Sequence, residues 1–169
     1  MDHPDTSARK VRFDNTVFAL LLVQFFVTSA MGGIIWFVQM VTYPQFAEIP
    51  ASKFISYHLN YSHQITWVVA PLMVIELFTG CAFASVLWRT SLRMPGLIGA
   101  LLAVATWGIT GLIQVPQHGA LSLGKDLETI NALVACNWIR VYLWSARSLL
   151  VGWIIFVLFR KNALVELSK

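Results

Sequence analysis

Apolar residues fill four long stretches of this chain, and short polar segments separate them. Each stretch is close to the roughly 20 residues that a helix needs to cross a bilayer. The pattern therefore predicts four membrane-spanning helices, at about residues 16–40, 65–88, 96–115 and 141–159. We expect an all-α fold, a four-helix transmembrane bundle, with residues 1–169 forming a single polytopic membrane domain.

Turn and cap residues predict that two of these helices are longer than their apolar spans. Pro44 and Pro50 bracket a turn, after which residues 51–64 continue as helix into the second span. Asp126 is placed to cap a helix that runs into the fourth span. We expect the second and fourth helices to extend on the outer side, with a kink at Pro71 in the second.

Composition and charge agree with a membrane protein and orient it. Hydrophobic residues make up 57% of the chain, charged residues 12%, and the mean hydropathy is +0.69. Eight of the twelve Lys and Arg residues fall on one side of the predicted bundle: Arg9, Lys10, Arg12, Arg89, Arg93, Arg160, Lys161 and Lys169. The positive-inside rule makes that side, and both termini, cytoplasmic. We expect the bacterial inner (cytoplasmic) membrane.

Glu76 and Arg147 each lie at the centre of an apolar span. A charged side chain at mid-membrane costs roughly 2.5–3.5 kcal/mol even on the lenient insertion scale and marks a functional site by default. In antiparallel helices the two would lie at similar depth, so we expect a buried ion pair. Two interpretations stay open: a structural pair that fixes helix register, and the floor of a pocket.

Polar residues recur at helical spacing on all four predicted helices. Each set falls on one helix face and therefore avoids lipid only by facing the bundle interior. The sets are Gly32, Trp36, Gln39 and Tyr43; His58 and Glu76; Trp107, Gly111, Gln114 and His118; and Asn137, Arg140, Trp144 and Arg147. This convergence predicts a polar chamber open to the outer side. Hydrogen bonds that only hold the helices together are the alternative.

Three histidines, His58, His63 and His118, fall on the predicted outer side. As a set they could bind a metal ion such as zinc or copper, and two of them could hold a haem b through axial ligands. The spacing of His58 and His63, five residues apart, differs from the i, i+4 pair of a helical zinc site. General acid–base catalysis needs only one histidine, His58 or His118, beside a substrate. We therefore expect no cofactor, and keep haem or a metal as the alternative.

The layout resembles the small four-helix membrane proteins of the anthrone-oxygenase-like family. Three segments carry the resemblance: GGIIWFVQMVTYPQF, LIQVPQHGAL and NWIRVYLWSAR. Some members of that family are implicated in oxygenating polycyclic phenolic anthrones without a metal or flavin. The resemblance implies that Asn137 and Arg140 are polar groups of a pocket and that Pro116 ends a helix. This chain departs from the pattern in its three histidines and its Glu76–Arg147 pair.

The sequence therefore predicts a membrane protein whose outward-facing pocket binds a small hydrophobic ligand, an aromatic or quinone-like molecule. One function of such a pocket is oxidative chemistry, in a cofactor-independent oxygenase-like enzyme. We assign catalytic roles to His58, His118 and Arg140, and ligand binding to Gln39, Tyr43, Gln114, Asn137 and Trp144. A haem- or metal-binding electron-transfer subunit and a small accessory or proton-coupled transport protein are the alternatives. Expected partners are the lipid bilayer and, beyond it, a homo-oligomer or larger membrane complex. Nucleic acid is not expected, because no basic run with interleaved aromatic residues occurs.

Overall fold

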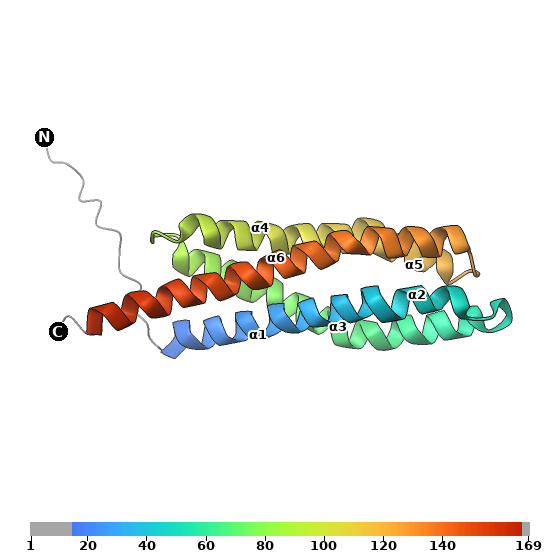
Figure 1. Cartoon of the computed structure of the whole chain (residues 1–169), viewed down its shortest axis with the longest axis horizontal. Coiled ribbons are helices and arrows are strands. Elements are labelled where there is room, and N and C mark those ends of the chain that lie inside the picture. The colour runs from blue at the N-terminus through green and yellow to red at the C-terminus, as the bar shows by residue number, and fades with distance from the viewer. Residues whose placement is uncertain (1–14, 167–169) are drawn as a thin grey trace, which may run out of the picture.

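Four long helices run alongside one another in the computed structural model, which describes residues 15–166 (Figure 1). They are α1 (Asn15–Phe37), α3 (Ala51–Leu87), α4 (Arg93–Ile109) and α6 (Leu127–Glu166). Helices α1 and α4 each pack against both α3 and α6. Every regular element within the described residues is helical, which confirms the predicted all-α class. We call the end where α1 begins and α6 ends the proximal end, and the opposite end the distal end.

Both halves of the described chain show the same order of elements. A long helix passes into a π-helix, then into a short helix, and after a turn into a second long helix. The π-helices are η1 (Val38–Thr42) and η3 (Thr110–Gln114). The short helices that follow them are α2 (Tyr43–Gln45), which continues into the 3-10 turn η2 (Phe46–Glu48), and α5 (Val115–Leu121).

A proline explains each π-helix. Pro44 and Pro116 each come two residues after a π-helix ends. Proline has no N–H, and its ring clashes with the carbonyl four residues earlier in an α-helix. The wider π turn relieves this, because the N–H of Tyr43 donates to the carbonyl of Val38, five residues back, and η3 ends in the same way. Each π turn also rotates the following side chains relative to the α-helical spacing.

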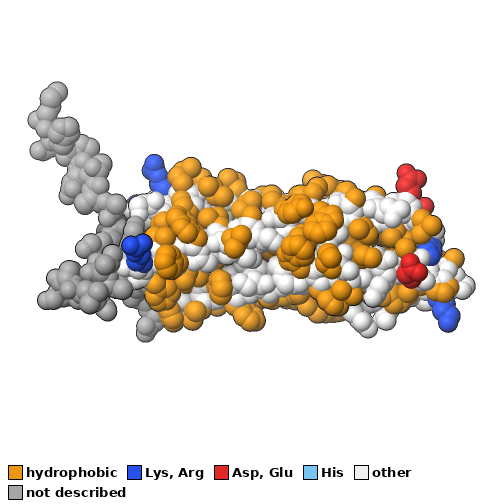
Figure 2. Space-filling model, viewed as in Figure 1, with side chains coloured by type: hydrophobic (Ala, Val, Ile, Leu, Met, Phe, Trp, Pro, Cys, Tyr) orange, Lys and Arg blue, Asp and Glu red, His pale blue; other side chains and the backbone are white. Residues whose placement is uncertain are grey.

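The outer surface of the bundle is apolar between its charged ends (Figure 2). Four helical segments are long and apolar enough to cross a membrane: Thr16–Glu48, Ala51–Leu87, Arg93–Leu121 and Leu127–Arg160. Large side chains stand out from them, such as Leu112 at 80% exposed and Trp67 at 71%. Soluble monomers rarely expose so much contiguous apolar surface. The surface is suited to contact with lipid.

Inside the bundle, three apolar clusters alternate with two polar layers. The proximal cluster contains Leu21, Phe83, Leu87, Leu92, Ile154 and Leu158. The middle cluster contains Met31, Ile35, Met73, Val141 and Trp144. The distal cluster contains Val38, Tyr43, Phe46, Phe54, Leu121, Ile130 and Leu133. Chain position places Glu76 and Arg147 between the first two clusters, and Arg140 between the second two.

The distal connections are fixed by hydrogen bonds. A carboxylate oxygen of Asp126 accepts a bond from the backbone N–H of Thr129 at 2.9 Å, so Asp126 caps α6 as predicted. The Lys125 ammonium donates to the carbonyls of Ala47 and Ile49 at 2.7 and 2.8 Å. The segment before α6 is thereby tied to the segment before α3.

Two predictions from the sequence remain predictions. Arg9, Lys10, Arg12 and Lys169, which were used to orient the bundle, lie outside the described residues. Helix α3 continues through Pro71, and the kink there stays a prediction.

Candidate functional site

Helix α6 supplies one wall of the candidate site. Asn137, Arg140 and Trp144 recur at intervals of three and four residues, so they share one helix face. Their exposed fractions are 0%, 5% and 0%, and Arg147, one turn further on, is 1% exposed. This face points into the bundle, as the spacing predicts.

A hydrogen-bonded layer joins this face to both π-helices. Nδ2 of Asn137 donates to Oε1 of Gln39 in η1 at 2.8 Å, and Nη1 of Arg140 donates to Oδ1 of Asn137 at 3.2 Å. The same Nη1 donates to Oε1 of Gln114 in η3 at 3.4 Å. Gln39 in turn donates to the carbonyl of Val134 at 3.2 Å. The Arg140 guanidinium is therefore positioned by both halves of the chain.

A second chain of hydrogen bonds leads from this layer toward the distal end. Oη of Tyr43 lies 3.3 Å from Oε1 of Gln114 and 3.0 Å from Nε2 of His118. Nδ1 of His118 lies 2.9 Å from Nε2 of His58. Nδ1 of His58 lies 3.4 Å from Oγ of Ser122, which is only part-buried. The structure thus links Tyr43, His118 and His58, from three different elements, into one chain.

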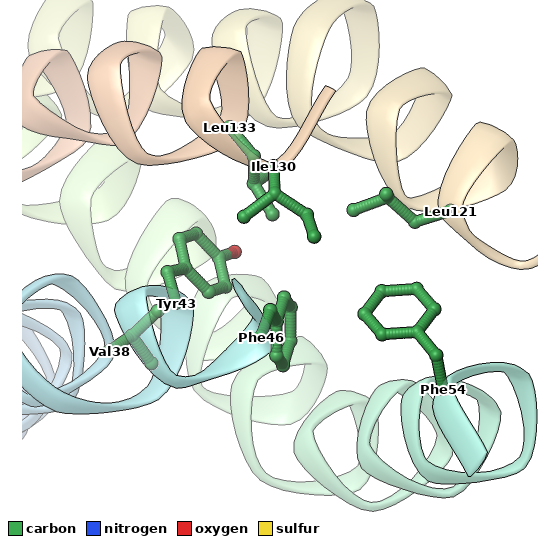
Figure 3. Close-up of a cluster of buried hydrophobic side chains, with 7 residues drawn as sticks. All are labelled: Val38, Tyr43, Phe46, Phe54, Leu121, Ile130 and Leu133. Carbon is green, nitrogen blue, oxygen red and sulfur yellow. The ribbon is translucent and has the colours of Figure 1, made fainter. Parts of the chain in front are cut away.

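Aromatic rings enclose the two histidines. The rings of His58 and His118 are within 24° of parallel, with centroids 5.2 Å apart. Phe54 stacks against His58 at 5.7 Å, and Phe46 meets the same ring edge-on at 5.5 Å. Figure 3 shows Phe46 and Phe54 in the distal cluster together with Tyr43. This packing keeps His58 at 0% exposed.

A cavity of about 270 Å³ lies beside the hydrogen-bonded chain. Tyr43, Gln114, His118 and Arg140 bring polar groups to it, and most of the remaining wall is aliphatic or aromatic. Ligand pockets typically combine an apolar wall with a few convergent polar groups. A more open hollow of about 500 Å³ at the proximal connection, residues 88–93, contains none of the buried polar side chains and is not a candidate.

Two side chains that line this cavity each carry a fully covered hydrogen-bond donor with no partner among the described residues: Nε2 of Gln114 and Nε of Arg140. The Gln114 amide cannot simply be reversed, because its Oε1 accepts from Arg140, and the reversed amide would set N–H against N–H. An unpaired buried donor costs about 1–3 kcal/mol. Because both side chains line the cavity, it is the candidate location for a group that would pair with them.

The buried charge beside the cavity is also unbalanced. The charged side chains that are buried, among those described, are Glu76, Arg140 and Arg147. Nη1 of Arg147 lies 2.5 Å from Oε1 of Glu76, so the structure pairs these two groups. Within the described residues no carboxylate forms an ion pair with Arg140, whose guanidinium lies over the Trp144 ring at 5.3 Å. One buried positive charge is left without a negative partner.

Trp144 belongs to the deeper polar layer. Its Nε1 donates to Oε2 of Glu76 at 2.9 Å, and its ring does not line the cavity. Trp144, which we assigned to ligand binding from the sequence, thus lies outside the cavity lining, between Arg140 and the Glu76–Arg147 pair. Asn137 and His58 do not line the cavity either, and each bonds to a residue that does, Arg140 and His118 respectively. Gln39 lies one step further back, bonded to Asn137.

His63 lies apart from the other two predicted histidines. It is exposed, and its Nε2 accepts a bond from Nε1 of Trp67 at 3.2 Å. The described residues hold no group of three or more His, Cys, Asp or Glu side chains arranged to hold a metal ion. The predicted set of His58, His63 and His118 is thus not assembled.

The histidine pair also does not fit a haem. Axial ligands on opposite sides of an iron require nitrogens about 4 Å apart, since each metal–nitrogen bond is about 2 Å. The facing nitrogens of His58 and His118 are 2.9 Å apart and bonded to each other. Their arrangement suits proton transfer better than metal ligation.

Two aromatic side chains lie elsewhere than the spacing of polar residues predicts. Trp36, predicted on an inner face, is 44% exposed and donates to Oγ of Ser145 at 3.0 Å. Tyr61 lines the cavity although no motif marked it. It follows His58 by three residues on α3, and that spacing is the signal that could have identified it.

Comparisons with protein-family models, with curated proteins and with solved structures found no match to this chain.

Proposed function

We propose that this protein is an integral membrane protein that binds a hydrophobic ring compound carrying a hydrogen-bond-accepting oxygen. One observation supports this most directly: Gln114 and Arg140, whose side chains each carry an unpaired buried donor, line an otherwise largely apolar cavity. A cavity of about 150 Å³ holds benzene. At about 270 Å³, this cavity has room for roughly two fused rings.

The residues at the cavity have different roles in ligand binding. Arg140 and Gln114 donate to the ligand oxygen, and Asn137, which is itself bonded to Gln39, holds the Arg140 guanidinium in place. The rings of the ligand pack against the aliphatic and aromatic wall of the cavity. His118, next to Tyr43 at 3.0 Å, moves a proton on or off the ligand. The ligand class agrees with what the resemblance to the anthrone-oxygenase-like family implies.

The proposed orientation places the proximal end in the cytoplasm and the site near the outer face of a bacterial inner membrane. Arg89, Arg93 and Arg160 lie at the proximal end, whereas acidic Glu48, Asp126 and Glu128 lie at the distal end. An excess of basic residues marks the cytoplasmic side. In this orientation α3 and α6 begin on the outer side.

The ligand reaches the site from the bilayer. Thr66 and Ala70 on α3, and Gly111 and Val115 across from them on η3 and α5, line the cavity and are also exposed on the outside of the bundle. Two of the four have very small side chains, so the wall is thin there. A lipid-dissolved ring compound would meet this opening without crossing water.

The test is ligand-induced thermal stabilisation of the detergent-purified protein with two-ring phenols, quinones and their ethers. A compound at 100 times its Kd stabilises the folded state by about 2.7 kcal/mol. For a chain of this length that corresponds to a shift of about 5–10 °C. We expect such a shift in the wild type and its loss in Arg140→Gln.

The matched control is Arg93→Gln, which removes an exposed arginine far from the cavity. This control should respond to the ligand as the wild type does. If no compound in the panel stabilises the wild type, or if Arg140→Gln responds as fully as Arg93→Gln, the proposed binding site is wrong.

A further inference from the structure

The hydrogen-bonded chain beside the cavity has two complete proton arrangements. In one, Tyr43 donates to Nε2 of His118, Nδ1 of His118 donates to Nε2 of His58, and Nδ1 of His58 donates to Ser122. Oγ of Ser122 can then donate to the carbonyl of His118, 2.8 Å away. In the other, every one of the first three bonds runs the opposite way, and Tyr43 donates to Gln114.

Switching between these arrangements moves one proton along the chain. Each histidine gains a proton on one ring nitrogen and loses one from the other, so neither needs to stay charged. The chain begins at Tyr43, on the cavity wall, and ends at part-buried Ser122 in the turn after α5. It therefore connects the cavity with the distal end of the molecule.

The charge inside the bundle favours expelling that proton. The described buried charges are two arginines and one glutamate, and the glutamate is already paired with Arg147. A neutral ligand would leave the charge of Arg140 uncompensated, whereas a ligand that loses a proton on binding would neutralise it. Charge-assisted hydrogen bonds are roughly twice as strong as neutral ones.

We infer that the cavity binds its ligand as an oxyanion and that the chain of Tyr43, His118, His58 and Ser122 carries the released proton to the distal end. This inference rests on the proposed function, because it assigns a charge state to the same ligand. The ligand is a hydrophobic compound with a weakly acidic O–H group, such as a phenol or an enol.

The step balances without an oxidant. The ligand O–H bond breaks, and its proton passes to Oη of Tyr43 as the hydroxyl proton of Tyr43 passes to Nε2 of His118. The Nδ1 proton of His118 passes to Nε2 of His58, and the Nδ1 proton of His58 leaves by Ser122 to water. The electron pair stays on the ligand oxygen, beside Arg140. Arg140 sets the equilibrium of this ionisation, and the histidines provide its route.

The equilibrium is tested with 2-naphthol, whose absorption shifts when it ionises, and with its methyl ether, which cannot ionise. In the wild type we expect the ionisation midpoint of bound naphthol to lie at least one pH unit below its value in empty detergent micelles. At a pH between these midpoints, binding should release about one proton per naphthol, and naphthol should bind at least tenfold more tightly than the ether. Arg140→Gln should bind both compounds only weakly and with equal affinity, and any naphthol that it binds should show no midpoint shift.

The route is tested by the relaxation rate of the naphtholate band after a rapid pH jump. His58→Phe should slow this relaxation at least tenfold without moving the midpoint. Ser122→Ala, at the end of the chain, gives a second variant if His58→Phe does not fold. His63→Phe is the matched control, because His63 is exposed and outside the chain.

Each negative outcome has its own meaning. An unshifted midpoint in the wild type, or equal affinity for naphthol and its ether, would overturn oxyanion binding while leaving the proposed function in place. Relaxation in His58→Phe and Ser122→Ala as fast as in His63→Phe would overturn the route. Failure of both compounds to bind the wild type would instead count against the proposed function.

Discussion

The Glu76–Arg147 pair makes a quantitative prediction about stability. Its facing atoms are 2.5 Å apart and its side chains are 3% and 1% exposed. At an effective dielectric constant of 20, opposite charges attract by about 4 kcal/mol at 4 Å and by more at shorter range. Desolvation offsets most of this gain, so the intact pair adds little net stability, but removing one partner costs about 3–5 kcal/mol.

The two single substitutions should differ in size. Glu76→Gln leaves Arg147 charged, because a guanidinium does not deprotonate in proteins, and should cost the full 3–5 kcal/mol or so. Arg147→Leu leaves a carboxylate that can neutralise itself by taking a proton. That protonation becomes harder by about 1.4 kcal/mol per pH unit, so the loss in Arg147→Leu should grow from pH 6 to pH 8.

The assay is a double-mutant cycle measured by thermal unfolding in detergent. A loss of 3–5 kcal/mol corresponds to roughly 6–20 °C for a chain of this length. We expect the double variant Glu76→Gln/Arg147→Leu to recover much of the loss, and exposed Arg93→Leu to change little. Simple addition of the two single effects would refute the claim that these residues stabilise each other.

Two further predictions concern neighbours of the polar layers. Gly80→Ala should lower the unfolding temperature, because the added Cβ would lie 2.7 Å from Nη2 of Arg147. Gly111→Ala is the control, because a Cβ there meets nothing within 4 Å, and it should not lower the unfolding temperature. Equal effects of the two substitutions would refute this argument. Hydrogen bonds from the Thr129 hydroxyl and backbone N–H hold the pKa of Asp126 below its usual value. The carboxylate therefore stabilises the fold at every pH above its unfolded pKa of about 3.9, and this stabilisation is lost as the pH falls through the lower pKa of the folded state. Asp126→Ala should therefore reduce thermal stability at pH 7 but not at strongly acidic pH, and a loss that is the same at both values would contradict the capping role.

Periodicity and caps predicted most of the architecture. Four apolar runs became four long helices, and Asp126 caps α6. The polar face of α6 was predictable because that helix is regular throughout, so residues three and four apart share a face. Glu76 and Arg147 lie at the centres of their predicted membrane spans, and this similar depth was enough to predict that their side chains form an ion pair.

The rest depends on features that residue spacing does not encode. Trp36 is exposed although it lies one helical turn from buried Gly32 on α1, so spacing alone does not decide its burial. Trp144 lies on the predicted face, but packing between helices decides that its N–H meets Glu76. The cavity itself is lined by side chains from α1, α3, η3, α6 and other elements, so no single segment specifies it.

The central claim is that the cavity is a binding site, and filling it tests that claim most directly. Ala70→Phe places a ring at the opening and alters none of the polar side chains at the site. Leu149→Phe adds a ring at a position that is 75% exposed and outside the cavity wall. In equilibrium dialysis with 2-naphthol, the account predicts one ligand per chain for the wild type and Leu149→Phe, and none for Ala70→Phe. Binding to Ala70→Phe with wild-type affinity would contradict it.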